Sequence, residues 1–223
     1  MNINADLSKR AVVKSSELPW TASPMSGVDR RMLDRIDDKV ERATTIVRFA
    51  PGSTFSPHVH GGGEEFLVLD GVFQDEHGDF PRGTYVRNPP TSHHTPGAAE
   101  GATIFVKLWQ FDPKDRNQVN VDTLSQEPQP VVDRPGVSEI ALYQDANERV
   151  RIECWEAEQL VSLDDHNGLE ILVIEGDFIE SGDNFGVHSW LRLPADQPFV
   201  ATAGAGGARV WVKSGHLKSP VNG

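Results

Sequence analysis

The chain has 223 residues, of which 38% are hydrophobic and 24% are charged, a composition typical of a soluble globular protein. Its net charge of −12 argues against a nucleic-acid-binding surface and against a polybasic membrane contact, because both need clustered positive charge. The single cysteine, Cys154, excludes an intramolecular disulfide, and no apolar run is long enough to span a membrane. Residues 1–20 are polar and lack the apolar core of a signal peptide, so we expect a cytoplasmic protein.

The first half of the chain reads as short β-strands separated by Gly, Pro and Asp turns. Runs rich in β-branched and apolar residues predict strands over residues 44–50, 64–70, 84–87 and 102–110, with a hairpin over 71–80. No segment has the period of an amphipathic helix. The pattern therefore predicts an all-β barrel or sandwich.

Two histidines and a carboxylate lie at the start of one predicted strand. His58 and His60 are two residues apart, so on a strand both side chains face the same side. Three glycines follow and permit a sharp turn, and Glu64 comes next. Imidazole and carboxylate ligands suit a divalent transition metal. A His-x-His pair alone is common on exposed strands, so the surrounding spacing has to decide.

That spacing resembles the motifs of the cupin family. The first motif comprises Gly52, His58, His60, Glu64 and Gly71, separated as the family requires, and the second comprises Gly83, Pro89 and His94. The second motif matches less closely. Thr91 occupies a position where the family usually has glycine, and Ala98 occupies one where it often has asparagine. The resemblance implies a jelly-roll barrel with a metal site.

One segment narrows the resemblance further. Residues 58–90, within a similar region of about 44–110, resemble the cupin-like domain of ChrR-type anti-sigma factors. In that family the domain binds zinc through two histidines, a glutamate and a further histidine. The resemblance therefore implies a zinc site in this chain formed by His58, His60, Glu64 and His94.

Two pairs of adjacent residues compete for a place in this site. Glu64 and Glu65 cannot both face inward on one strand, and the six-residue gap to the following glycine favours Glu64. His93 and His94 compete in the same way, and the count from the preceding proline favours His94. Glu65 and His93 are then the alternative ligands or lie beside the site.

The second half of the chain repeats the first with a shift of 105 residues. Residues 170–178 align with 65–73, and the register holds as far as Pro89 and Pro194. A constant register of this length indicates a tandem duplication. We therefore expect two cupin domains, at 1–115 and 131–223, joined by a polar, proline-containing linker at 116–130.

The second copy lacks the metal ligands. The shift maps His58, His60, Glu64 and His94 onto Leu163, Asp165, Leu169 and Phe199. We expect a degenerate second domain without metal, filled by side chains that include Leu163, Leu169, Phe199 and Trp211. Its role would be structural, either covering the first domain or forming an interface such as that of a homodimer.

Aromatic and cationic residues near the motif are candidates for a ligand cavity. The aromatic candidates are Phe55, Phe66, Tyr85, Phe105 and Trp109. The alternative is plain barrel core, since small barrels are mostly filled by side chains. Arg87 is a candidate for binding an anionic ligand, but its counterpart Arg192 in the metal-free copy favours a structural salt bridge.

The sequence leaves metal and function open between several alternatives. Zinc is expected from the resemblance, and iron(II), nickel, manganese or copper also accept this ligand set. The resemblance implies a metal-binding sensor or regulatory module with an unknown small-molecule ligand. A metal-dependent oxygenase-type enzyme is the second class, and an inert storage-type bicupin is the third, which the intact ligand set disfavours.

A partner suggested by the resemblance is not expected. In ChrR-type proteins a separate N-terminal zinc-binding helical domain binds the sigma factor. Residues 1–43 are too short for that domain and contain no cysteine for its zinc site. The sequence therefore does not predict sigma-factor binding.

Overall fold

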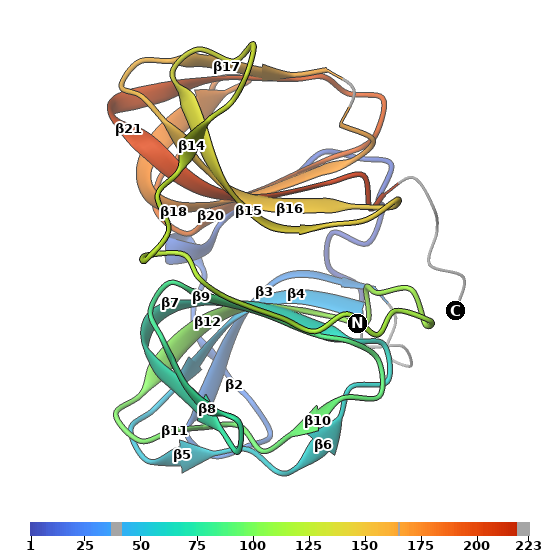
Figure 1. Ribbon diagram of the computed structural model, residues 1–223. Helices are drawn as coiled ribbons and strands as arrows, with labels where there is room; N and C mark the ends of the chain where they lie inside the picture. Colours follow the sequence, from blue (N-terminus) through green and yellow to red (C-terminus); the bar gives the residue numbers. More distant parts are fainter. Residues whose placement is uncertain (37–41, 165, 218–223) are drawn as a thin grey trace. The chain divides into compact units, whose positions relative to one another are not determined.

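The computed structural model describes residues 1–36, 42–164 and 166–217. These residues form two compact units, each built from β-strands (Figure 1). The first unit comprises Met1–Ala5 and Pro19–Leu124, and the second comprises Asp6–Leu18 and the chain from Ser125 onward. The described residues contain no α-helix, only the short 3-10 helix η1 at Ser15–Glu17. The all-β class expected from the strand pattern is confirmed.

The first unit has a large antiparallel sheet and a small two-stranded one. Its strands are β2 (Thr21–Ala22), β3 (Val28–Ile36), β4 (Arg42–Phe49), β5 (Ser53–Thr54), β6 (His58–Val59), β7 (Glu64–Asp75), β8 (Gly78–Pro81), β9 (Thr84–Asn88), β10 (His93–His94), β11 (Gly97–Ala98), β12 (Ala102–Leu108) and β13 (Val119–Asp122). The main sheet runs β13-β9-β7-β12-β4-β3-β2, with β8 and β11 pairing β7, and β5 pairing β11. Strands β6 and β10 form the separate pair, which carries part of the candidate site.

The second unit has one sheet of the same order. Its strands are β1 (Ala11–Lys14), β14 (Gln129–Pro130), β15 (Val137–Gln144), β16 (Arg149–Trp155), β17 (Leu160–Leu163), β18 (Leu169–Glu180), β19 (Asp183–Phe185), β20 (Ser189–Leu193) and β21 (Phe199–Ser214). The sheet runs β1-β20-β18-β21-β16-β15-β14, with β17 pairing β21 and β19 pairing β18. Each unit is a jelly-roll of the kind expected from the sequence.

The edge strands of the two units come from unexpected parts of the chain. Strand β1 precedes the first unit in sequence but pairs with β20 of the second, while β13 pairs with β9 of the first. The two edge strands pair in the same register. Val12 lies opposite Leu191, and Asn120 lies opposite Val86, which corresponds to Leu191 under the shift of 105 residues. The strand before each repeat therefore completes the other repeat.

This exchange changes the expected domain boundaries. The interval 6–18, placed by the sequence in the first domain, belongs to the second unit. The expected linker 116–130 contains β13 and β14, which belong to different units. Polar composition concealed these strands, because an edge strand exposes one of its rows of side chains to solvent.

Side chains alternate between the two faces of each strand, and the inward-facing ones form an apolar core in each unit. In the first unit the core includes Phe66, Phe73 and Phe80. The core of the second unit includes Leu169 and Phe199, with Leu163 packed against it. Trp211 departs from the expectation: it is buried, but its neighbours Val210 and Val212 belong to the core, so the indole faces the other side of the sheet.

One glycine is required at the same place in both units, close to an irregularity of the strand pairing. Gly71 and Gly176 both have φ +71°, in the left-handed region that favours glycine. An added Cβ would collide with the carbonyl oxygen of Gly101 or Gly207 respectively. The glycine at the end of the first motif therefore has a backbone role that is independent of the metal ligands.

Candidate metal centre

The four expected ligands converge in the first unit. Ligand atoms of His58, His60, Glu64 and His94 all lie within 4.8 Å of one another. His58 and His94 are directly opposite each other on the paired strands β6 and β10, and Glu64 is the first residue of β7. His60 lies just beyond β6, before the glycine turn. The described residues contain no second group of three or more such side chains.

Two of the imidazoles are held through Nδ1 by acceptors. Nδ1 of His58 lies 2.9 Å from the backbone oxygen of Ser56, which can only accept. Nδ1 of His60 lies 2.9 Å from Oγ of Ser92, whose own hydroxyl donates to the carbonyl of Pro89. Both Nδ1 atoms must therefore carry the hydrogen, which leaves the Nε2 lone pairs free.

His94 is held by a carboxylate in the same way. Its Nδ1 lies 3.0 Å from Oδ2 of Asp75, at the end of β7. A carboxylate that orients the outer nitrogen of a histidine is a common arrangement behind metal ligands. Sequence reasoning did not identify Asp75 or Ser92, because neither forms a motif with the ligands; only the hairpin and loop bring them there.

The inner atoms fit a metal ion. Nε2 of His60 and Nε2 of His94 are buried, and neither has a hydrogen-bond partner among the described residues. They lie 3.4 and 3.5 Å from Oε2 of Glu64. Two ligand atoms that each lie about 2.1 Å from one metal ion are about 3 to 3.4 Å apart. The separations between these atoms are therefore close to those of ligands that share an ion. The cluster could hold a divalent transition metal.

The pKa values of the two inner histidines are shifted in opposite directions. Desolvation lowers the pKa of His60 to about 4, although the charge of Glu64 opposes the change. Desolvation also acts on His94, but the hydrogen bond to Asp75 and the charge of Glu64 outweigh it and raise the pKa of His94. His60 is therefore neutral at pH 7, as a metal ligand must be.

The structure separates the competing neighbours. Glu65 faces the other side of β7, where its Oε2 accepts a hydrogen bond of 2.7 Å from the Tyr85 hydroxyl. His93 is exposed, while His94 is buried in the cluster. Alternation along the strand thus excludes both alternatives from the cluster.

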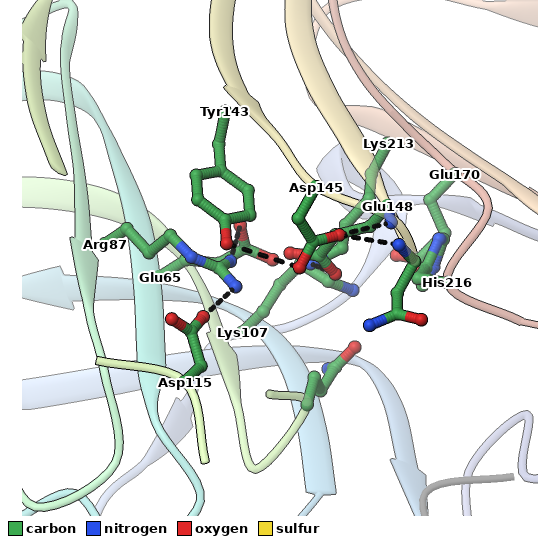
Figure 2. Close-up of polar contacts among 12 residues, drawn as sticks. Glu65, Arg87, Lys107, Asp115, Tyr143, Asp145, Glu148, Glu170, Lys213 and His216 are labelled. Carbon is green, nitrogen blue, oxygen red and sulfur yellow. Dashed lines mark hydrogen bonds and ion pairs between the residues drawn. The ribbon is translucent and has the colours of Figure 1, made fainter. Parts of the chain in front are cut away.

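Arg87 is part of a buried ion-pair network and does not line the cavity. It pairs with Asp115 at 2.7 Å (Figure 2), and its guanidinium carbon lies 3.7 Å from the ring centre of Phe111. Glu65 lies 3.9 Å away on the same side of the sheet. These contacts agree with the structural salt bridge expected from Arg192. The alternative, that Arg87 binds an anionic ligand in the cavity, is wrong.

A cavity of about 410 Å³ adjoins the ligand cluster. Its walls include His58, His60 and Glu64, together with Phe55 and Trp109 from the predicted aromatic set. The other three candidates do not line it. Phe66 packs in the barrel core, and Tyr85 and Phe105 lie on the opposite face of their strands.

Two arginines that sequence reasoning missed also line this cavity. Arg30 and Arg35 both lie on β3, five residues apart, a spacing that would place them on opposite faces of a regular strand. The register of β3 against β4 shifts between Met32 and Asp34, and this irregularity restores the same facing. A bulge cannot be recognised from alternation alone, so this pair could not be predicted from the sequence.

Trp109 explains why three glycines follow His60. An added Cβ at Gly61 or Gly62 would collide with the Trp109 indole, and one at Gly63 would collide with the Phe111 ring. The amide of Trp109 donates to the carbonyl of Gly63 at 3.1 Å. The glycines therefore give a large aromatic residue room to cover the loop between His60 and Glu64.

The second unit replaces the cluster by apolar contacts. Leu163 lies opposite Phe199 across β17 and β21, just as His58 lies opposite His94. Leu169 occupies the position of Glu64 and is fully buried. The counterpart of His60, Asp165, lies outside the described residues. No group of potential ligands is present among the described residues of this unit.

Family comparison agrees with this geometry. Residues 8–112 match the family model described as the ChrR cupin-like domain. Residues 8–112 therefore form a ChrR-like cupin domain, and the chain shares the cupin fold. A search of curated proteins finds no match.

Solved structures share the fold at low sequence identity. A proposed dioxygenase from Nostoc punctiforme superposes with a TM-score of 0.77 at 12% identity, covering 96% of this chain and 85% of that one. The pirin YhhW from Escherichia coli, in complex with nickel(II), gives 0.66 at 14% identity, covering 92% and 98%. A cupin 2 conserved barrel domain protein from Leptotrichia buccalis gives 0.61 at 10% identity, covering 95% and 98%.

Among the described residues, no helix has the length and apolar character needed to cross a bilayer.

Proposed function

We propose that the first unit is a metal-dependent ligand-binding domain, in which His58, His60, Glu64 and His94 hold one divalent transition metal. The observation that carries the proposal is that this cluster forms one wall of the 410 Å³ cavity. A coordination position left open by the four protein ligands would face that cavity. Its volume is within the usual range of small-molecule sites. Zinc is the metal we propose first, with iron, nickel and manganese as alternatives.

The bound metal would supply a Lewis-acidic anchor for an oxygen or nitrogen atom of the ligand. The residues of the chain do the rest. Ser56, Ser92 and Asp75 fix the histidine rings. Apolar side chains such as Phe49 and Ile104 line the remaining space and exclude water. This combination supports a sensor or regulatory role in which ligand or metal occupancy is the signal.

An oxygenase-type enzyme is the second candidate. The open cavity beside the cluster and the fold shared with the proposed dioxygenase favour it. Against it, Glu64 is the only carboxylate among the described cavity-lining residues, so no separate acid–base group is at hand. The two candidates differ in turnover: an enzyme consumes oxygen, and a sensor does not.

The test is metal content after expression without an affinity tag. We expect the wild-type protein to retain about one equivalent of transition metal by elemental analysis. His60→Ala should lose it, because that change removes a buried ligand. His93→Ala, beside His94 but exposed, is the matched control and should retain the metal. A wild-type protein that neither copurifies with nor binds zinc, iron, nickel or manganese would overturn the proposal.

A second measurement separates sensor from enzyme. Iron(II)-loaded protein is mixed with a diketone or flavonol, and oxygen uptake is followed with an electrode. Uptake that disappears in His60→Ala would favour the oxygenase. Metal binding without uptake would favour the sensor.

A further inference from the structure

The cavity contains a guanidinium that the metal site does not use. Arg30 lies opposite Val47 on the paired strands β3 and β4, and both residues line the cavity. The Nε atom of Arg30 is buried and has no hydrogen-bond partner among the described residues. A buried donor left without an acceptor costs free energy, which a bound ligand would recover.

The cavity walls carry more positive than negative charge. Arg30 and Arg35 contribute two cations, and Glu64 is the single carboxylate among the described lining residues. A divalent ion on the ligand cluster would more than neutralise Glu64. The site as a whole then favours an anion, because opposite charges attract strongly in a partly desolvated cavity.

Neighbouring arginines on these strands are used differently. Arg31 and Arg48 both lie over the Trp20 ring, with guanidinium carbons 4.3 and 4.4 Å from its centre. Arg48 also pairs with Asp29 at 2.7 Å. The Nε atom of Arg31 also lacks a hydrogen-bond partner, but its guanidinium is covered by the Trp20 ring. Arg30 differs from both because it lines the cavity.

The second unit shows what Arg30 lacks. The paired registers place Glu139 at the position of Arg30 and Glu153 at the position of Val47. In that unit Glu153 accepts two hydrogen bonds of 2.8 Å from Arg134, and Glu139 pairs with Arg149. Each of these two carboxylates thus has an arginine partner inside the second unit. In the first unit the residue at the position of Glu153 is a valine, so this position provides no carboxylate for Arg30.

We infer that Arg30 is the anion-binding residue of the cavity and that the ligand is a small organic acid with a second donor group for the metal. Val47, Phe49, Ile104 and Val106 line the same cavity and provide apolar walls for a hydrocarbon segment. An α,ω-dicarboxylate has this chemistry, with one carboxylate for Arg30 and one for the metal. The inference rests on the proposed function, since the metal is the second anchor.

The test compares adipate with hexanoate, which has the same chain length but only one carboxylate. Binding of both probes to Co²⁺-loaded full-length protein is measured by calorimetry, after Co²⁺ binding itself has been measured. We expect the wild type to prefer adipate by about tenfold or more, the worth of a charge-assisted hydrogen bond. In Arg30→Met the preference should fall to within about twofold, with Co²⁺ affinity unchanged. Arg48→Met, the same substitution outside the cavity, should behave as wild type.

Thermal unfolding distinguishes binding from a structural role. Arg30→Met removes an unpaired buried donor and keeps most of the side-chain volume, so its melting temperature should be equal to or above that of the wild type. A large decrease would point to a structural role and contradict the inference. Co²⁺ binding without a preference for adipate, or a preference that survives in Arg30→Met, would overturn the inference alone. Failure to bind Co²⁺ would overturn the proposed function and the inference with it.

Discussion

Where the first unit pairs His58 with His94, the second unit pairs Leu163 with Phe199. The strand order and the register of the exchanged edge strands are the same in both units. So is the left-handed glycine, at Gly71 and Gly176. The comparison shows that backbone requirements maintain the jelly-roll, while a few inward side chains decide whether it holds polar ligands or an apolar core.

The interiors also differ in how charge is handled. The interior of the second unit contains a buried ion pair between Arg134 and Glu153. A further buried pair, Lys213 with Glu148 at 2.9 Å, lies on the other face of the sheet (Figure 2). The first unit leaves Nε2 of His60, Nε2 of His94 and Nε of Arg30 without partners among the described residues. In the second unit, Arg134 Nε and Glu139 Oε2 also lack hydrogen-bond partners, but both residues are paired through their other atoms. The three atoms of the first unit lie at the ligand cluster and its cavity, where a bound metal or ligand could pair with them.

The largest effect on stability is expected from introducing a metal-ligand residue into the second unit. Leu169→Glu places a carboxyl group at a fully buried core position, so we expect it to reduce the free energy of unfolding by about 4 kcal/mol. Chemical denaturation of the full-length protein measures this. The reciprocal change, Glu64→Leu, should abolish metal binding without destabilising the metal-free protein. Equal destabilisation by both changes would contradict the comparison.

Removing the acid of the second unit should have the next largest effect. Burial opposes ionisation of Glu153, but hydrogen bonds from Arg134 and the charges of Arg151 and Arg134 lower its pKa to about 2. Its pKa in the unfolded chain is about 4.3, so the stability it contributes is present above about pH 4.3 and is lost as the pH falls toward 2. Glu153→Gln should cost about 3 kcal/mol at pH 7.

The pH profile checks that prediction. The difference in unfolding free energy between wild type and Glu153→Gln should shrink as the pH is lowered from 5 to 2. Glu156→Gln, a change at an exposed residue nearby, serves as the control and should leave the profile unaltered. A difference that stays constant with pH would show that ionisation of Glu153 is not its source.

The support of the metal ligand should matter less than the ligand itself. Asp75→Asn removes the carboxylate behind His94 and should weaken metal affinity by about 10- to 100-fold. Competition with a chromophoric chelator measures the affinity. Glu76→Gln changes the exposed neighbouring carboxylate, which contacts the Thr95 amide, and should have no effect on metal affinity. An unchanged metal affinity in Asp75→Asn would show that Asp75 does not support His94 as a metal ligand.

The smallest expected effect sharpens the charge comparison. Val47→Glu gives the first unit the acid that the second unit has at Glu153, and this carboxylate should pair with Arg30. The preference for adipate over hexanoate should fall by about tenfold, while metal affinity is retained. Val47→Gln has nearly the same size without the charge and should keep most of the preference. Equal losses in both variants would indicate crowding of the cavity.

Much of the site could be predicted because it depends on spacing. Two histidines two residues apart, a glycine turn and a glutamate fix which side chains face one way, and counting selected Glu64 over Glu65 and His94 over His93. The shift of 105 residues then identified the apolar counterparts Leu163, Leu169 and Phe199. Parity also accounts for the errors: Tyr85, Phe105 and Trp211 are aromatic and buried, but they face away from the interiors for which they were predicted.

By itself, the sequence determined the β class, the repeat and the set of four ligands, because strand alternation and motif spacing are local properties of the chain. Only the tertiary structure decided which edge strand completes which unit, since β1 and β13 pair with partners that no local pattern specifies. It also decided the surroundings of the ligands. Asp75 reaches His94 through a hairpin, and Arg30 and Arg35 share a cavity because the register of β3 shifts between them. These contacts join residues that are distant in sequence, and they arise only when the sheets pack.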